Sequence, residues 1–188
     1  NVRELAQTVH QSCTQSPRRY GFHATLKPPF RLADGKSLAQ LERELSAFAQ
    51  RQHAVKIGQM KLKAIGRFLA LVPGEQSDEL SDFAAKTVET FDSFRAPLSA
   101  ERREKRMAAG LSPRQIELLD LWGYPYVMDQ FRMHMTLSDP LDENTGPLML
   151  NGAKKFFAPV LAKSHILDRI CLFEEAAPGE PFSRIADF

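Results

Sequence analysis

Apolar and polar residues alternate in two widely separated stretches of the chain, residues 20–27 and 131–138. This period of two is typical of a strand that buries one face and exposes the other. Two such exposed faces turned toward each other would form a cleft. The exposed faces combine imidazole, hydroxyl and cationic groups: His23, Thr25 and Lys27 in the first stretch, and Arg132, His134, Thr136 and Ser138 in the second.

The remaining periodicity predicts alternating helices and strands. The block that begins at His23 and the block that begins at His134 share one order, which is strand, helix, strand, turn and strand. His23 precedes Val55, and His134 precedes Ile166, by the same 32 positions. Helices are expected at residues 2–12, 38–52, 77–94, 98–109, 114–122 and 148–161, and further strands at 55–65, 68–72, 166–174 and 182–188.

This order predicts an α+β protein with an internal duplication. We expect one bilobal domain over residues 1–188, with lobe one at about 1–76, a helical connecting segment at about 77–126 and lobe two at about 127–188. The lobes would be pseudo-symmetric strand-helix-strand-strand units whose antiparallel sheets face each other across a central cleft. Such packing would bring the two histidine segments together.

Composition places the chain among ordinary globular proteins. It has 188 residues, of which 43% are apolar and 26% charged, and its net charge of +2 neither favours nor excludes nucleic acid. Cys13 and Cys171 lie far apart in the sequence. Two such cysteines are typical of free thiols in a reducing cytoplasm. No apolar run approaches a membrane span and no signal peptide is visible, so we expect a cytoplasmic protein without a membrane partner. The oligomeric state is open.

The paired histidines suggest acid–base chemistry. Histidine titrates near neutral pH, so one neutral imidazole can act as base while one imidazolium acts as acid. This predicts His23 and His134 as a catalytic pair, because cleavage of a phosphodiester requires both proton transfers. The predicted phosphate-binding groups are Thr25, Thr136, Lys27 and Arg132, although a solvated cation is an equally good interpretation of the last two.

A metal site is the competing interpretation. Two histidines are too few ligands for zinc, and Asp129 and Asp139 lie an odd number of positions from His134. Strand alternation would therefore point both carboxylates to the opposite face, and we expect neither a metal nor another cofactor. The remaining histidines are expected to be structural or surface residues: His10, His53 and His165.

The paired His-x-Thr-Leu motifs in a duplicated α+β frame resemble the 2H phosphoesterase superfamily. The strings YGFHATLKPPF at 20–30, WGYPY at 122–126 and FRMHMTL at 131–137 look more narrowly like its DUF1045 branch, found among bacterial phosphonate-utilisation operons. The resemblance spans nearly the whole chain. It implies the same catalytic pair, a phosphate-binding pair of Thr25 and Thr136, and an additional apolar strand and helix before the position of Asn1.

We therefore expect a metal-independent phosphoesterase that hydrolyses a cyclic phosphodiester of a nucleotide or phosphosugar, in connection with phosphonate metabolism. One alternative is an RNA end-processing phosphodiesterase or ligase, which would make RNA a partner. Another is a non-catalytic module that binds a nucleotide or phosphosugar. The sequence names neither the substrate, nor the bond that is cleaved, nor which histidine is the base.

Overall fold

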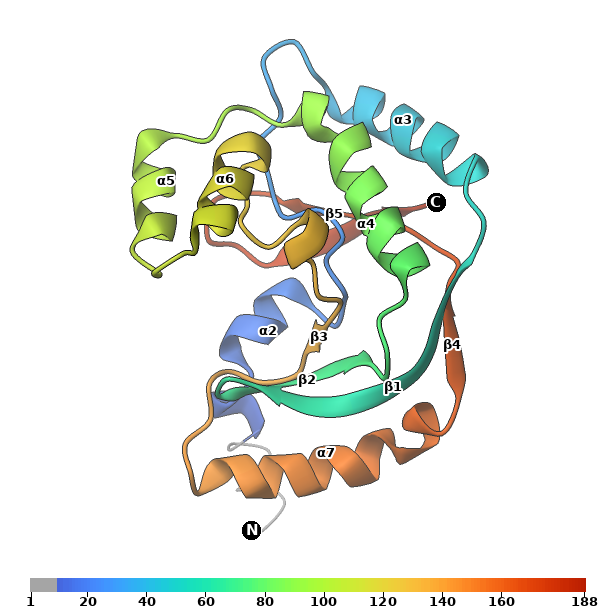
Figure 1. Ribbon diagram of the computed structural model, residues 1–188, viewed down its shortest axis with the longest axis vertical. Helices are drawn as coiled ribbons and strands as arrows, with labels where there is room; N and C mark the ends of the chain where they lie inside the picture. The colour runs from blue at the N-terminus through green and yellow to red at the C-terminus, as the bar shows by residue number, and fades with distance from the viewer. Residues whose placement is uncertain (1–9) are drawn as a thin grey trace. The chain divides into compact units, whose positions relative to one another are not determined.

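Residues 10–188 are described in a computed structural model, and they fold as an α+β protein, which confirms the predicted class (Figure 1). The chain divides into two units. Unit 1 contains the residues up to Thr25, Ile57–Glu75 and Met133–Asp187, and unit 2 contains Leu26–Lys56 and Gln76–Arg132, with Phe188. Each unit thus combines segments that lie far apart in the sequence. The predicted helix at 2–12 falls largely outside the described residues, and the predicted bilobal division stays a prediction.

A four-stranded sheet with the order β3-β2-β1-β4 forms the frame of unit 1. Strands β1 (Val55–Ile65) and β2 (Phe68–Pro73) form an antiparallel hairpin in which Ile65 pairs with Phe68. The turn begins at Gly66, whose φ of 57° suits a tight hairpin connection. Both strands agree with the sequence prediction, and Figure 1 shows that β1 is strongly curved.

The last third of the chain supplies the rest of unit 1. Helix α7 (Thr145–Leu161) leads to β4 (Ser164–Leu167), and β5 (Cys171–Glu175) pairs antiparallel with β6 (Phe182–Asp187) in a separate two-stranded sheet. The single strand predicted at 166–174 is therefore wrong, because residues 168–170 separate two strands that belong to different sheets.

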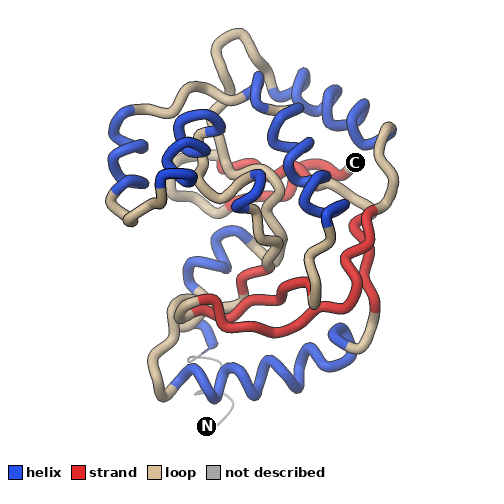
Figure 2. Tube along the Cα trace, viewed as in Figure 1, coloured by secondary structure: helices blue, strands red, loops and turns tan. Residues whose placement is uncertain are grey.

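The strand predicted around the first histidine is also wrong. Helix α2 (Gln15–Tyr20) occupies the start of this stretch and ends at Gly21, whose φ is 71°. Pro17 does not stop the helix, because it lies in the first turn, where no backbone donor is needed. The loop trace in Figure 2 then runs from residue 21 to α3, interrupted by one isolated bridge between Leu32 and Arg95.

The strand predicted around the second histidine is much shorter than expected. Only β3 (Met135–Thr136) joins the sheet, with Thr136 opposite Ala70 of β2. It follows the 3-10 helix η2 (Met128–Gln130), and residues 131–134 belong to no strand. The two histidine segments therefore differ in local structure, and the pseudo-symmetry of two lobes stays a prediction.

Unit 2 is largely helical, and its helices begin at serine N-caps that the sequence indicates. Ser37 caps α3 and Ser112 caps α6, each with a glutamine that completes a capping box. The core centres on Phe48, whose ring lies 5.3 Å from that of Phe91. The helices are α3 (Leu38–Gln50), α4 (Asp78–Thr90), η1 (Asp92–Phe94), α5 (Ala100–Met107) and α6 (Pro113–Trp122).

Candidate functional site

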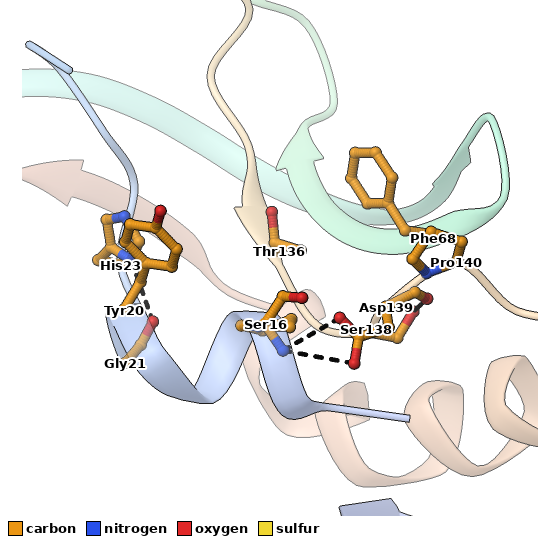
Figure 3. Close-up of a pocket in the computed structure, with 10 residues that line it drawn as sticks. Ser16, Tyr20, Gly21, His23, Phe68, Thr136, Ser138, Asp139 and Pro140 are labelled. Atoms are coloured by element: carbon orange, nitrogen blue, oxygen red, sulfur yellow. Dashed lines mark hydrogen bonds between the residues drawn. The ribbon is translucent and has the colours of Figure 1, made fainter. Parts of the chain in front are cut away.

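A pocket of about 250 Å³ lies within unit 1, and two predicted site residues, His23 and Thr136, line it (Figure 3). In this view Thr136 stands between His23 on one side and Phe68 on the other. The walls come from α2, β2 and the segment after β3. Other lining residues that matter for the site are Ser16, Tyr20, Ser138 and Asp139.

Both ring nitrogens of His23 have partners in its own segment. Nδ1 lies 3.0 Å from the carbonyl oxygen of Gly21, and Nε2 lies 2.9 Å from Oγ1 of Thr25. A carbonyl oxygen can only accept, so Nδ1 carries the hydrogen, and in the neutral ring Nε2 accepts from the threonine hydroxyl. The structure thus brings His23 and Thr25 together, and Thr25 helps to hold the imidazole at the pocket.

An aromatic stack supports the imidazole. The Tyr20 ring is stacked with His23 at 6.0 Å between centroids and with Phe182 of β6 at 4.9 Å. Phe173 of β5 lies 5.9 Å from the imidazole. Arg19 lies over the rings of Tyr20 and Phe182 and forms an ion pair with Glu175. These contacts anchor the C-terminal end of α2 against the two-stranded sheet.

Asp139 anchors the other end of α2. Its carboxylate accepts hydrogen bonds from the backbone N–H groups of Gln15, at 2.6 Å, and Ser16, at 3.1 Å. Figure 3 shows the contact with Ser16. The expectation that Asp139 faces away from the site is wrong, because β3 ends at Thr136 and strand alternation does not reach position 139. This role has no local signal in the sequence, because the two partners lie 124 and 123 positions away.

The hydroxyl of Ser138 fixes the segment that follows β3. Ser138 is 1% exposed, and its Oγ accepts from the backbone N–H of Leu69 at 3.0 Å and donates to the carbonyl oxygen of Asp139 at 2.8 Å. A signal for this residue was present in the sequence, because it lies two positions after Thr136 on the same expected face. Its hydrogen bonds hold the pocket wall together.

His134 is exposed, and its ring lies 6.3 Å from that of Phe68, which lines the pocket. The second histidine therefore stands next to the pocket wall, while the first forms part of the lining. The catalytic role predicted for His23 and His134 stays a prediction.

The two predicted cations belong to unit 2 and have partners there. The side chain of Lys27 is 7% exposed, and its ammonium donates to the carbonyl oxygen of Val88 at 3.0 Å and pairs with Asp92 at 3.3 Å. Burial lowers the pKa of Lys27, and the Asp92 charge opposes this shift. Arg132 is exposed and donates to the carbonyl oxygens of Asp129 and Phe131. Their predicted roles in phosphate binding stay predictions.

Residues 10–188 contain no group of three or more His, Cys, Asp or Glu side chains placed to hold a metal ion. Cys13 and Cys171 are free thiols. Of the helices that the structure describes, none has the length and apolar character to cross a bilayer.

The family described as "Protein of unknown function (DUF1045)" matches residues 25–183, so the chain belongs to this family. The narrower of the two resemblances seen in the sequence is therefore confirmed. The match covers His134 and all of unit 2 apart from Phe188, whereas His23 lies two positions before it.

Two curated relatives share one name, "Ribose 1,5-bisphosphate phosphokinase PhnN". The chain is 37% identical to the protein of Janthinobacterium sp. (strain Marseille) over 186 residues, which is 97% of this chain and 41% of the relative. It is 33% identical to that of Laribacter hongkongensis (strain HLHK9) over 164 residues, which is 87% of this chain and 38% of the relative. The chain thus spans less than half the length of either relative. No solved structure matches the chain.

These names overturn the expected hydrolysis. A phosphokinase transfers a phosphoryl group to an acceptor, whereas the expected cyclic phosphodiesterase would transfer it to water, so the prediction of a hydrolase is wrong. The coarser expectations agree with the comparisons, since the relatives are named as enzymes that act on a small phosphorylated sugar.

Proposed function

We propose that this chain binds a small phosphorylated sugar in the unit 1 pocket, as part of a protein related to ribose 1,5-bisphosphate phosphokinases. One observation carries the proposal: His23 and Thr136, which come from segments far apart in the sequence, line the same pocket. The hydroxyl groups of Ser16 and Tyr20 add hydrogen-bonding capacity to that lining.

The chemistry of the lining suits this ligand. Phosphate oxygens accept hydrogen bonds from hydroxyl groups and, more strongly, from a protonated imidazole. Sugar rings also carry apolar C–H faces, which the rings of Tyr20 and Phe68 can cover. The volume of about 250 Å³ is at or below the range of about 300–1,000 Å³ usual for ligand pockets, which favours a compact ligand.

The proposal assigns recognition of the phosphosugar, and not phosphoryl transfer, to this chain. The matched region is 41% of one relative and 38% of the other, so more than half of each relative lies outside it. This takes up the binding-module alternative that the sequence left open. The wider likeness to the 2H superfamily rests on the paired histidine motifs, and the link to phosphonate metabolism rests on membership of the DUF1045 family. Both are part of this proposal.

Calorimetric titration of the 188-residue chain with ribose 1,5-bisphosphate, and with unphosphorylated ribose for comparison, tests the proposal. We expect binding of the bisphosphate and at least tenfold weaker binding of ribose. His23→Gln and Thr136→Val should each weaken bisphosphate binding about tenfold or more, because a hydrogen bond to a charged group contributes about 1.5–3 kcal/mol.

His165→Gln provides a matched control in unit 1. His165 bonds the carbonyl oxygen of Val160 at 2.8 Å and does not line the pocket, so its substitution should leave the dissociation constant unchanged. Equal affinity for ribose and the bisphosphate, or unchanged affinity in both pocket variants, would contradict the proposal.

A further inference from the structure

A second pocket, of about 310 Å³, lies entirely within unit 2 and is strongly basic. Its arginines come from the loop after Pro29, the segment after η1 and helix α5. Gly123, the residue just after α6, also lines the pocket. Two arginines of the helix that was expected at 98–109 line this pocket. The four arginines are Arg31, Arg95, Arg102 and Arg106.

One of these guanidinium groups is paired with a carboxylate. Arg95 donates to both oxygens of Asp92, at 2.7 and 3.1 Å, and also to the carbonyl oxygen of Leu121. Its side chain is 15% exposed. Arg95 is therefore a fixed wall of the pocket, and it shares the single carboxylate of Asp92 with Lys27.

The other three arginines have no carboxylate within ion-pair distance in the part of the chain that the structure describes. Arg106 lies over the Tyr124 ring, with 4.6 Å between the guanidinium carbon and the ring centroid, a contact that leaves its charge in place. Three positive charges thus border one small pocket. Because like charges repel, an anion in the pocket would relieve the repulsion among them.

The pocket is held in shape by backbone contacts. Ala96 N–H donates to the carbonyl oxygen of Arg31 at 2.8 Å, and Leu32 bridges to Arg95, so the two arginine-bearing segments lie side by side. Gly123 has φ of 73°, and a Cβ there would lie 2.8 Å from Nη1 of Arg95. Any larger residue at position 123 would therefore displace the Arg95 guanidinium from its place in the pocket wall.

The N-terminus of α5 adds to the positive potential. Ser99, which caps α5 by accepting from the backbone N–H of Arg102 at 3.3 Å, lines the pocket. The partial positive charge of a helix N-terminus favours anions, and guanidinium groups bind phosphate oxygens in pairs.

We infer that this arginine pocket binds a compact polyphosphate, the chemical class that includes the phosphate tail of nucleoside di- and triphosphates. Three uncompensated charges exceed what one phosphate group balances, since such a group carries about −1.5 to −2 near neutral pH. Two or three linked phosphates match the charge and fit a small volume. This site is separate from the phosphosugar pocket of the proposed function and does not depend on it.

Titration of the 188-residue chain with inorganic tripolyphosphate, orthophosphate and ATP tests the inference. Tripolyphosphate should bind at least tenfold more tightly than orthophosphate. If the natural ligand is a nucleoside triphosphate, ATP should bind at least as tightly as tripolyphosphate. If the natural ligand is free polyphosphate, ATP should bind more weakly. Arg31→Gln and Arg102→Gln should each weaken tripolyphosphate binding about tenfold, with far-ultraviolet circular dichroism to verify folding.

Lys105→Gln is the matched control. Lys105 lies on the same helix as Arg102, is exposed and does not line the pocket. Its replacement by Gln removes one positive charge, as Arg102→Gln does, but leaves the pocket lining intact. An equal loss of affinity in Lys105→Gln and Arg102→Gln would show a diffuse basic surface and overturn the inference. Tighter binding of a single-stranded RNA than of tripolyphosphate would overturn it as well. His23→Gln should leave tripolyphosphate binding unchanged, which separates this site from the pocket of unit 1.

Discussion

The Nε2 atom of His23 lies 2.9 Å from Oγ1 of Thr25, in a segment that forms neither helix nor strand. The same ring reaches back to the carbonyl oxygen of Gly21 through Nδ1. The imidazole is therefore held by groups two positions before it and two positions after it. The spacing of the His-x-Thr motif pairs an imidazole with a hydroxyl even where the expected strand is absent.

This contact predicts an unusual tautomer. Since the Gly21 carbonyl oxygen can only accept, the neutral ring of His23 should carry its hydrogen on Nδ1. Nitrogen-15 NMR at a pH where the imidazoles are neutral should show the Nδ1–H form for His23. His165 provides an internal comparison, because its Nε2 bonds the carbonyl oxygen of Val160 and should carry the hydrogen instead. Identical tautomers in both residues would contradict the assigned geometry.

Asp139→Ala should destabilise the protein by removing the cap of α2. The carboxylate satisfies two backbone N–H groups that otherwise have no intrahelical partner, and loss of a helix N-cap typically costs about 1 kcal/mol. Urea unfolding measures this cost, and amide exchange should speed up at Gln15 and Ser16. Asp168→Ala, on the connection between β4 and β5, serves as the control. No change in exchange at the two amides would argue against the cap.

Asp92→Ala should destabilise the protein by about 2 to 3 kcal/mol, because it leaves the buried ammonium of Lys27 without its carboxylate and Arg95 without its bidentate partner. The same substitution in a Lys27→Met background should cost at least about 1 kcal/mol less, since no buried ammonium then remains. Denaturant unfolding of the four proteins of this cycle gives the coupling. Asp82→Ala, on the exposed face of α4, is the control. If the costs of the two single substitutions add up to the cost of the double substitution, Lys27 and Asp92 are not coupled.

Asp129 should titrate far below an ordinary aspartate. The hydrogen bonds from Arg114, and then from Gln130, lower its pKa to about 2. Because the folded pKa lies below the usual value of about 3.9, the charged form stabilises the fold above about pH 4, and this contribution is lost as the pH falls toward 2. Carboxyl NMR titration should show the low value in the wild type and a rise in Arg114→Gln. Arg103→Gln, which removes the partner of Asp120, should leave the Asp129 titration unchanged.

Interactions within short stretches of chain were predictable from the sequence. Ser37 and Ser112 begin helices because their side chains accept hydrogen bonds from amides three positions on, and the β1–β2 hairpin follows from alternation around Gly66. The pairing of His23 with Thr25 belongs to the same group, since it needs only a spacing of two residues.

Contacts between distant parts of the chain were decided by the tertiary structure. The expected helix at 2–12 stops before Gln15, yet a further helix, α2, forms at Gln15–Tyr20. Asp139, more than 120 positions away, accepts hydrogen bonds from its first backbone N–H groups. Lys27 shares its expected strand face with His23, but its ammonium is buried against Asp92 in unit 2. Helix caps and turns depend on neighbours that the sequence displays, whereas burial and long-range hydrogen bonds depend on packing, which no local pattern records.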